Sequence, residues 1–387
     1  MKTIGDQQLV KRINRSVLLR LLRAQPGLSR SQLSAESGLT KSTVSALVRE
    51  LLEDGWLHEA GAHSVDGLGR PSIPLQINVG VRALIGVEIA IEVVRVVAVS
   101  LQGEVLYSQA QPLDSSAPAA VCTRVAQLVC QAHRQLLASG LQLSGVGVGI
   151  PGAVDDASGM VRFAPNLGWR DVNLLPGLQE ALAREGLSGV SVQLKNDADA
   201  AALGEYEFLD GEGEDPLIYV SCDVGVGAGI VLNDRLFVGA RGMAGEIGHT
   251  VLQIDGPRCS CGRNGCAEAF LGSRVLDRQA PDLRAAAVFL GVLLQNLWVT
   301  FEPRAIVVGG KSCEAHPEFL RDAIATVQRY ADSAGMTPPA IRVPRYGAWT
   351  PAVGAAALAL HEYLRPLHPN AQARRERAAA DAATGSH

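Results

Sequence analysis

Three cysteines and one histidine lie close together in the stretch GEIGHTVLQIDGPRCSCGRNGCAEAF. His249 precedes Cys259 by ten positions, and Cys261 and Cys266 complete the group. Thiolates and an imidazole at short spacing are typical ligands of Zn²⁺, and four of them fill a tetrahedral site with no open position. The stretch therefore predicts a structural zinc site with His249 as the fourth ligand. The alternative is three buried or free cysteines, which the C-x-C-x₄-C spacing beside glycines disfavours.

The first 80 residues have the pattern of a winged helix-turn-helix. Apolar residues recur at helical spacing, Ser29 and Thr40 precede two of the helical segments as caps, and Gly38 supplies the turn between them. Glycine and proline in the segment Gly69-Arg70-Pro71 predict a loop between two strands. The expected elements are helices over 8–24, 31–37 and 41–54, and strands over 56–60 and 73–78.

A helix-turn-helix places its second helix in the major groove of double-stranded DNA. We expect the exposed side chains at the start of that helix to contact bases or phosphates: Thr40, Lys41, Ser42, Thr43 and Ser45. Arg30 and Arg49 are expected to contact phosphates, and Arg70 in the wing suits a narrow A·T minor groove. The alternative is a small helical module that binds proteins. The agreement of caps, turn and wing favours DNA.

Composition and charge narrow the class of protein. Of the 387 residues, 47% are hydrophobic and 19% are charged, which is typical of a folded protein with more than one domain. The first 80 residues hold 10 Lys/Arg and 7 Asp/Glu, whereas the remainder holds 25 and 32, so only the head is basic. We expect no signal peptide and no apolar run of about 20 residues, hence a cytoplasmic protein without a membrane partner.

From residue 81 the pattern changes to alternating strands and helices. Three strands in LIGVEIAI, VRVVAVS and EVLYSQA precede a helix over 118–139, and the strand GVGVGI ends at Pro151-Gly152. Further elements are expected as a helix over 172–185, the strand SVQLKND, a helix over 198–208, the hairpin LIYVSCDV/GAGIVLNDRL, a helix over 282–300, the strand 305–310 and a helix over 351–363. This order predicts a duplicated α/β body, residues 81–364, with a cleft between two lobes. Residues 365–387 are expected to form a disordered tail.

These motifs together resemble the ROK family, named for repressors, open reading frames and kinases. The most specific stretch is GEIGH…CSCGRNGCAE, supported by IPGAVD, PNLGW, NDADAAALGE, GVGAGI and VVGG, and the resemblance runs from about residue 8 to 363. The head, with GLTKSTVS and a GRP wing, resembles the regulators of the family. The resemblance implies an α/β fold: an N-terminal winged helix-turn-helix followed by a duplicated actin-like (ribonuclease H-like) domain of the sugar-kinase type.

The resemblance also implies a sugar site in the cleft between the lobes. Carried over to matching positions, the sugar-binding residues are Gly152, Asn166, Asn196, Asp197, Glu246, His249 and Glu268. A polyol needs converging donors and acceptors, which these residue types provide. Each has a plainer interpretation: Asn196-Asp197 can cap a helix, Glu268 can be surface charge, and Asn166 can be a turn residue.

In kinases of this family the counterpart of Asp197 is a general base, and two glycine- and threonine-containing turns hold ATP. Here the first turn reads Glu88-Ile89-Ala90-Ile91-Glu92, without Gly or Thr, and the second reads Asp223-Val224-Gly225-Val226-Gly227, without Thr. Acidic side chains at phosphate-binding turns repel phosphate. The sequence therefore predicts that ATP binding is lost or poor and that the chain is not a kinase.

The favoured hypothesis is a transcriptional regulator, and more specifically a repressor, of carbohydrate metabolism. A sugar or sugar-phosphate effector in the cleft changes the angle between lobes and so the spacing of the two heads in a homodimer or tetramer. One alternative is an ATP-dependent sugar kinase. Another is a regulator controlled by sequestration on a transport protein.

Overall fold

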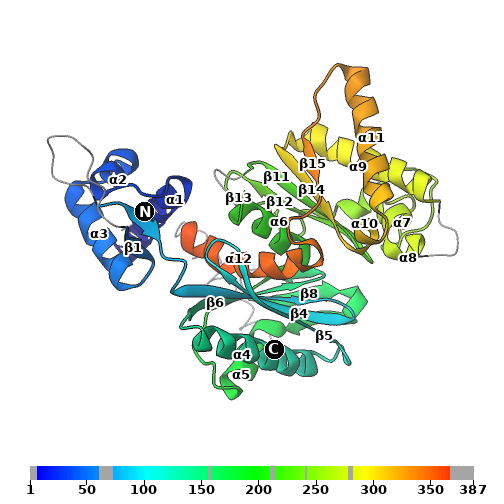
Figure 1. Ribbon diagram of the computed structural model, residues 1–387. Helices are drawn as coiled ribbons and strands as arrows, with labels where there is room; N and C mark the ends of the chain where they lie inside the picture. The colour runs from blue at the N-terminus through cyan, green and yellow to red at the C-terminus, as the bar shows by residue number, and fades with distance from the viewer. Residues whose placement is uncertain are drawn as a thin grey trace, which may run out of the picture.

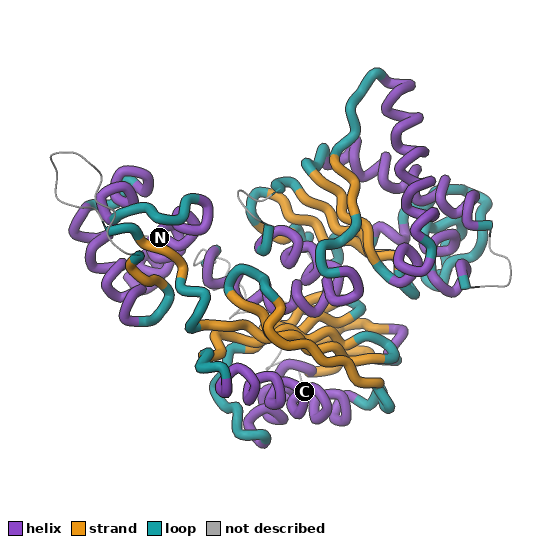
Figure 2. The backbone as a smooth tube through the Cα atoms, viewed as in Figure 1, coloured by secondary structure: helices purple, strands orange, loops and turns teal. Residues whose placement is uncertain are grey.

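A computed structural model describes residues 7–60, 73–155, 158–209, 214–239, 242–277 and 282–366. Its head stands beside two lobes, and each lobe holds a sheet with helices packed on it (Figures 1 and 2). The three parts follow one another along the chain. The head comes first, the strands of the first sheet lie between residues 82 and 196, and those of the second lie between residues 217 and 342. The predicted head and two-lobed body are therefore confirmed.

The head contains three helices and a short two-stranded sheet. Ser29 and Gln32 form a reciprocal capping box at the second helix, and Thr40 accepts a hydrogen bond from the backbone N–H of Thr43 at the third. Both predicted caps are confirmed. The loop that carries Arg70 lies outside the described residues. The elements are α1 Gln7–Ala24, α2 Arg30–Ser37, α3 Lys41–Glu53, β1 Leu57–Glu59 and β2 Leu75–Ile77.

The two lobes repeat one sheet topology. The first sheet has the order β10-β6-β3-β4-β5 and the second has the order β13-β12-β11-β14-β15. In each sheet the first three strands in chain order are antiparallel and the last two run parallel to the first. This duplication confirms the predicted ribonuclease H-like fold class. The strands are β3 Arg82–Ile89, β4 Val93–Ser100, β5 Val105–Pro112, β6 Gln142–Ile150, β10 Val192–Asn196, β11 Leu217–Cys222, β12 Val226–Leu232, β13 Arg235–Leu236, β14 Ala305–Gly309 and β15 Ala340–Arg342.

Helices cover both faces of each sheet. Alternate residues of β3 divide between two cores: Ile85 packs toward α4 and α5, whereas Leu84 packs toward α6 and α12. Helices α9 and α11 cover the outer face of the second sheet. The helices are α4 Pro118–Ala138, α5 Leu174–Arg184, α6 Asp197–Glu207, α7 Glu268–Leu271, α8 Ser273–Leu276, α9 Leu283–Phe301, α10 Lys311–Ala315, α11 Pro317–Ala334 and α12 Thr350–Leu364.

Small residues let α6 and α12 lie very close to each other and to the sheets. A Cβ atom added to Gly204 would lie 2.6 Å from Cα of Gly354, and one added to Gly147 would lie 1.7 Å from the carbonyl oxygen of Ala355. The core of these two helices is continuous with the core of the head, which contains Leu18 and Val44. The pair α6/α12 is therefore the central layer that joins both lobes and the head.

Several predicted boundaries are wrong. A three-stranded sheet, β7 Ala153–Asp155, β8 Met160–Ala164 and β9 Trp169–Asn173, occupies the segment before α5 and replaces the first two residues of the predicted helix. The predicted start of a tail at residue 365 is wrong, because Arg365 is anchored by ion pairs and Pro366 is buried. Residues 367–387 lie outside the described part of the chain.

Helix α9 corrects a second expectation. By length and composition alone it is apolar enough to cross a membrane, and it is the one such helix among the described residues. The expectation that no apolar stretch reaches this length is therefore wrong. Leu290, Leu294 and other side chains of α9 are buried in the core of the second lobe, where α9 packs against α11. A core helix satisfies the same length and composition test, so α9 is assigned to the core.

Candidate functional site

A cleft of ≈ 1400 Å³ opens between the two lobes. The first lobe contributes residues at the ends of β3 and β6, such as Glu88 and Pro151, and the second contributes the turn after β11, including Asp223. All seven residues of the predicted sugar site line this cleft: Gly152, Asn166, Asn196, Asp197, Glu246, His249 and Glu268. The fold thus brings together residues from segments that are far apart in the sequence.

The start of α6 positions two of these side chains. Asn196 caps the helix, because its Oδ1 accepts hydrogen bonds from the backbone N–H groups of Ala198 and Asp199, and its Nδ2 donates to the carbonyl oxygen of Gly152. The plainer interpretation of Asn196 as a helix cap therefore holds, although the residue also lines the cleft. Gly152 must be glycine for two reasons: its φ of 125° is a conformation that other residues rarely adopt, and an added Cβ would lie 2.3 Å from the carbonyl oxygen of Phe163.

Asp197, the first residue of α6, faces a group of other acids. Burial raises the pKa of its carboxyl to about 6, and the charges of Asp223 and Glu246 add to the effect. Burial likewise raises the pKa of Glu246. Carboxylates that repel one another in a cleft are stabilised by ligands that donate hydrogen bonds. This end of α6 is therefore suited to a ligand rich in hydroxyl groups.

His249 stands between the cleft and the cysteines. Its Nε2 lies 3.9 Å from a carboxylate oxygen of Glu246, whereas its Nδ1 lies 3.6 Å from Sγ of Cys259. Glu268 is also held on both sides: it accepts hydrogen bonds from the backbone N–H of Val226 and from the hydroxyl of Ser260. The interpretation of Glu268 as a mere surface charge is therefore wrong, since it connects β12 to the cysteine loop.

The predicted ligands of the metal converge. One ligand atom from each of His249, Cys259, Cys261 and Cys266 lies within 4.8 Å of the others, and the sulfurs of Cys261 and Cys266 are 3.7 Å apart. A tetrahedral zinc site with ~2.3 Å zinc–sulfur bonds has sulfur–sulfur edges of about 3.8 Å. The donor set and its spacing therefore fit Zn²⁺. Gly265, with φ 71°, lets the loop pass against the backbone of Gln253.

Two contacts across the cleft join the lobes. Arg274 of α8 donates a hydrogen bond of 2.9 Å to Oδ1 of Asn166, and Lys311 of α10 lies 3.4 Å from the carboxylate of Glu92 in the turn between β3 and β4. Sequence reasoning missed Arg274 and Lys311, because neither residue belongs to a motif and only the fold brings them to the cleft.

At the predicted nucleotide turns the side chains interact with one another. Glu88 forms a 2.8 Å ion pair with Arg95, yet burial raises the pKa of the Glu88 carboxyl to about 7 despite the opposing effect of the arginine. Asp223 accepts hydrogen bonds from the hydroxyl of Ser221 and the backbone N–H of Lys311. Acidic groups therefore line this part of the cleft.

The predicted DNA-contacting residues lie on one part of the head. Lys41, Ser42, Ser45 and Arg49 are exposed on α3, and Thr43 is half-buried. Four of the predicted contacts already have partners: the Thr40 hydroxyl caps α3 and lies 2.9 Å from the hydroxyls of Ser42 and Thr43, and Arg30 forms a 2.9 Å ion pair with Glu59. A direct role in DNA binding stays a prediction for each of these residues, and for Arg70 outside the described residues.

The fold and these sites define a class of protein in which a winged helix-turn-helix is joined to a duplicated ribonuclease H-like body with a cleft and a cysteine-rich loop. Residues 84–282 match the ROK family and residues 12–57 match a winged helix-turn-helix DNA-binding family. The chain belongs to the ROK family, and its head makes it a transcriptional regulator of that family.

Three relatives illustrate this placement. The xylose repressor of Bacillus subtilis (strain 168) is 28% identical over 385 residues, which cover 93% of this chain and 98% of the repressor. The crystal structure of a ROK family transcriptional regulator, a homologue of the E. coli MLC protein, shares the fold with a TM-score of 0.74 at 22% identity and covers 92% of this chain and 98% of its own. A ROK family glucokinase from Streptomyces griseus, solved with glucose and AMPPNP, has 28% identity and a TM-score of 0.58, and covers 72% of this chain and 99% of its own.

Proposed function

We propose that this protein is a transcriptional repressor that binds operator DNA through its head and is controlled by a sugar or sugar derivative in the interlobe cleft. The observation that carries the proposal is the convergence of seven polar or glycine positions from separate segments on one cleft, in a chain with a winged helix-turn-helix. The similarity to a xylose repressor along nearly the whole chain supports it. Such a regulator works in the cytoplasm, as a homodimer or tetramer.

Sugar recognition follows from the chemistry of the cleft. Carboxylates of Asp197 and Glu246 can each accept hydrogen bonds from two neighbouring hydroxyls, and Nε2 of His249 is directed to the same region. Glu268, Asn166 and the cap formed by Asn196 and Gly152 line the same cleft. A sugar that forms these bonds also offsets the mutual repulsion of the buried acids.

Zinc is the cofactor that fits the cysteine loop. Held by His249 Nδ1 and the three thiolates, it would have no open position and would stabilise the loop without taking part in a reaction. Coordination through Nδ1 also fixes the ring, so that Nε2 keeps its direction toward the cleft. We expect strong chelation to lower both the melting temperature and the affinity for sugar. Re-addition of Zn²⁺ should restore both.

Control of DNA binding requires that the sugar favours one arrangement of the lobes over another. In a dimer, the two heads must lie about 34–36 Å apart to enter successive major grooves on one face of DNA. A change in the lobes that alters this separation changes the affinity for the operator. The repressor sign is proposed from the similarity to a repressor.

A thermal-shift screen of the full chain tests the proposal. The panel contains D-xylose, D-glucose, N-acetylglucosamine and their phosphates, and ligands that bind only the folded state raise the melting temperature. We expect at least one sugar to do so and to change the affinity for a DNA duplex selected from a random-sequence library. Specific DNA binding that no sugar alters would contradict sugar control and favour sequestration by another protein.

A kinase is the second candidate, because the family resemblance implies a general base at Asp197, which lines the cleft, and a ROK family glucokinase shares the fold. The acidic turns argue against it: Glu88 engages Arg95, Glu92 engages Lys311, and Asp223 faces the same region. A coupled assay with ATP, Mg²⁺ and the same sugars should give no turnover above background. Sustained turnover would establish the enzyme.

A further inference from the structure

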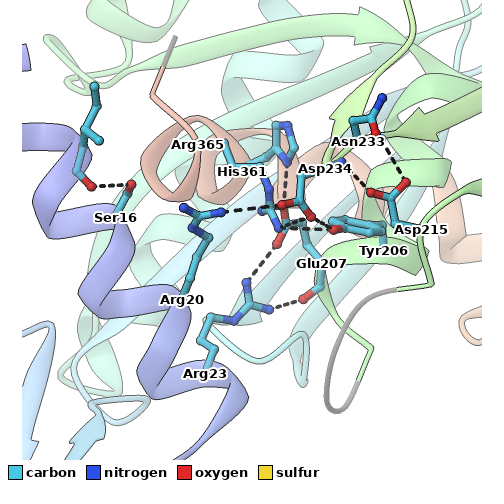
Figure 3. A network of polar contacts seen from close by, with 11 residues as sticks. Ser16, Arg20, Arg23, Tyr206, Glu207, Asp215, Asn233, Asp234, His361 and Arg365 are labelled. Atoms are coloured by element: carbon cyan, nitrogen blue, oxygen red, sulfur yellow. Dashed lines mark hydrogen bonds and ion pairs between the residues drawn. The ribbon is translucent and has the colours of Figure 1, made fainter. Parts of the chain in front are cut away.

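The head meets the body at a buried carboxylate. Glu207, the last residue of α6, is 2% exposed, and its side chain binds three cationic or hydrogen-bonding partners. Arg23 of α1 lies 2.9 Å from Oε2, Nδ1 of His361 lies 2.6 Å from Oε1, and Arg365 also contacts Oε1. Arg23 donates a second hydrogen bond to the backbone carbonyl oxygen of Glu207 (Figure 3). One side chain thus joins the head, α6 and α12.

A second carboxylate extends this network into the second lobe. Asp234, in the turn between β12 and β13, accepts a hydrogen bond from the Tyr206 hydroxyl and lies 3.4 Å from Arg365. Arg20 of α1 lies 3.6 Å from the same carboxylate (Figure 3). The two arginines, one turn apart on α1, therefore hold different parts of the body: Arg23 holds α6 and Arg20 holds the second lobe. We call these six side chains the junction: Arg20, Arg23, Glu207, Asp234, His361 and Arg365.

Aromatic, cation–π and hydrogen-bond contacts hold the head beside the junction. The ring of Trp56 stacks on Tyr363 of α12 with centroids 4.2 Å apart, and the guanidinium of Arg82 lies 5.2 Å from the Trp56 ring. Arg82 also donates hydrogen bonds to the backbone carbonyl oxygen of Asp54 at the end of α3. Several contacts therefore hold the head against the ends of α6 and α12.

The opposite ends of the same two helices reach the cleft. Asp197 at the start of α6 and Pro351 in the first turn of α12 both line it. A helix of eleven residues spans about 15 Å at 1.5 Å per residue, so α6 is a short rigid connection between Asp197 and Glu207. Gly204 and Gly354 mark the place where α6 and α12 pack most closely, since a Cβ added to Gly204 would lie 2.6 Å from Cα of Gly354, and this close packing couples the two helices.

We propose that α6 and α12 transmit ligand binding from the cleft to the head, with Arg23–Glu207 as the contact that passes the movement to α1. This inference rests on the proposed function, since it concerns the regulation of that cleft by sugar. A buried carboxylate must keep its cationic partners, so α1 follows any displacement of the end of α6. Arg23 is a positioning residue: it lies at the junction, away from the residues that line the cleft.

The experiment compares Arg23→Gln with Lys11→Gln in the full chain. Both changes remove one positive charge from α1, but Lys11 pairs with Glu50 inside the head, and this pair involves no junction residue. For each protein we measure the dissociation constant for the selected DNA duplex with and without saturating D-xylose, or the panel sugar that raises the melting temperature. The affinity for that sugar is measured separately by calorimetry without DNA.

The wild-type ratio of the two DNA dissociation constants is expected on the order of 5–150-fold. Arg23→Gln should bring this ratio close to one while sugar affinity stays within about twofold, and Lys11→Gln should keep the wild-type ratio. Arg23→Lys, which keeps the charge but not the paired donors, should give an intermediate ratio. Intermediate coupling with normal sugar affinity is a result that a purely structural role would not produce.

Two results would overturn the inference alone: an unchanged ratio in Arg23→Gln, or a parallel loss of sugar affinity, which would make Arg23 a support of the cleft. A wild-type ratio of one, measured with sugar bound, would instead overturn the proposed function, and the transmission with it. If Arg23→Gln does not fold, Arg23→Lys carries the test at the same contact: a wild-type ratio with normal sugar affinity in Arg23→Lys would then overturn the inference.

Discussion

The two ends of α6 place carboxylates in opposite environments. At the first residue, burial and the neighbouring acids raise the pKa of Asp197 to about 6. At the last residue, burial alone would raise the pKa of Glu207, but His361, Arg365 and Arg23 outweigh it and lower the value to about 2. Each pKa shift corresponds to roughly 3 kcal/mol: the charged form of Asp197 is destabilised by this amount, and the charged form of Glu207 is stabilised by it. The cleft end disfavours its charge and the head end requires it.

This difference opposes the helix macrodipole, which favours anions at the start of a helix and disfavours them at the end by about 0.3–1 kcal/mol. Local partners therefore decide the charge at both ends. Helix α6 therefore has one end whose buried carboxylate, Asp197, faces other acids, and one end whose buried carboxylate, Glu207, is paired with cationic partners. A ligand acts at the first end, and the head is attached at the second.

The largest expected effect is at the paired end. Glu207→Gln removes the buried charge that Arg23, His361 and Arg365 share, and we expect it to lower the free energy of unfolding by about 3–5 kcal/mol. Chemical denaturation followed by tryptophan fluorescence and circular dichroism measures this. The control is Glu180→Gln, whose exposed pair with Arg184 should contribute less than about 1 kcal/mol. If Glu207→Gln lowered the free energy of unfolding by no more than Glu180→Gln, Glu207 would not be the stabilising buried charge described here.

The pH dependence of stability should have opposite signs at the two ends. Glu207 has a folded-state pKa below its ordinary value of 4.5, so its contribution is present above that pH and is lost as the pH falls toward about 2. Asp197 has a folded-state pKa above its ordinary value of 3.8, so stability falls as the pH rises from there to about 6. Each slope is at most about 1.4 kcal/mol per pH unit.

Differences between wild type and single variants isolate these slopes from the other titrating groups. Between pH 4 and pH 6, wild type should lose stability relative to Asp197→Asn as the pH rises. Below pH 4.5, the advantage of wild type over Glu207→Gln should shrink as the pH falls. Melting temperatures collected across this range provide both curves. Slopes of the same sign would show that the two carboxyls do not differ as described.

Asp197→Asn should have a smaller effect on stability at neutral pH, and in the opposite direction. The amide removes a buried charge while keeping an oxygen that can accept the hydrogen bond from the backbone N–H of Ala198. We expect the free energy of unfolding to rise by about 1–2 kcal/mol at pH 8, because less charge is buried. Sugar affinity should fall at least about tenfold, since an ionised acceptor is lost. Thermal shift with and without sugar measures both, and a destabilised variant with normal sugar affinity would contradict the assignment.

The sequence predicts the two lobes, the caps at Ser29 and Thr40 and the metal-ligand cluster, because periodicity, local capping and short spacing are written in neighbouring residues. It does not predict the junction. Arg23 and Glu207 are 184 positions apart, and neither belongs to a motif, so only the packing of α1 against the ends of α6 and α12 brings them together. The cross-cleft pair Asn166–Arg274, 108 positions apart, could not be predicted from the sequence for the same reason.

Some helix boundaries predicted from the sequence are also wrong, and some helices are missed. The predicted helix over 172–185 begins later because Trp169–Asn173 pairs with β8 as β9. The helix α11, Pro317–Ala334, and the short α10 before it escape prediction altogether. Arg365 was assigned to a tail on composition, whereas its charge is held by two carboxylates that the fold brings to it. At β9 and at Arg365 long-range pairing overrides the local pattern, whereas α11 carries apolar residues at helical spacing and was locally predictable.

The smallest expected effect separates the apolar from the polar part of the attachment. Tyr363→Leu keeps an apolar side chain beside Trp56 but removes the stacked ring, which contributes about 0.5–1.5 kcal/mol. Because Tyr363 is 44% exposed, the lower part of that range is expected as the loss in the free energy of unfolding, measured by chemical denaturation. The polar pairs of Glu207 remain intact, so the effect of sugar on DNA affinity should stay within about twofold of wild type. Loss of that effect in Tyr363→Leu would mean that ring packing, and not the buried carboxylate, holds α1 to the body.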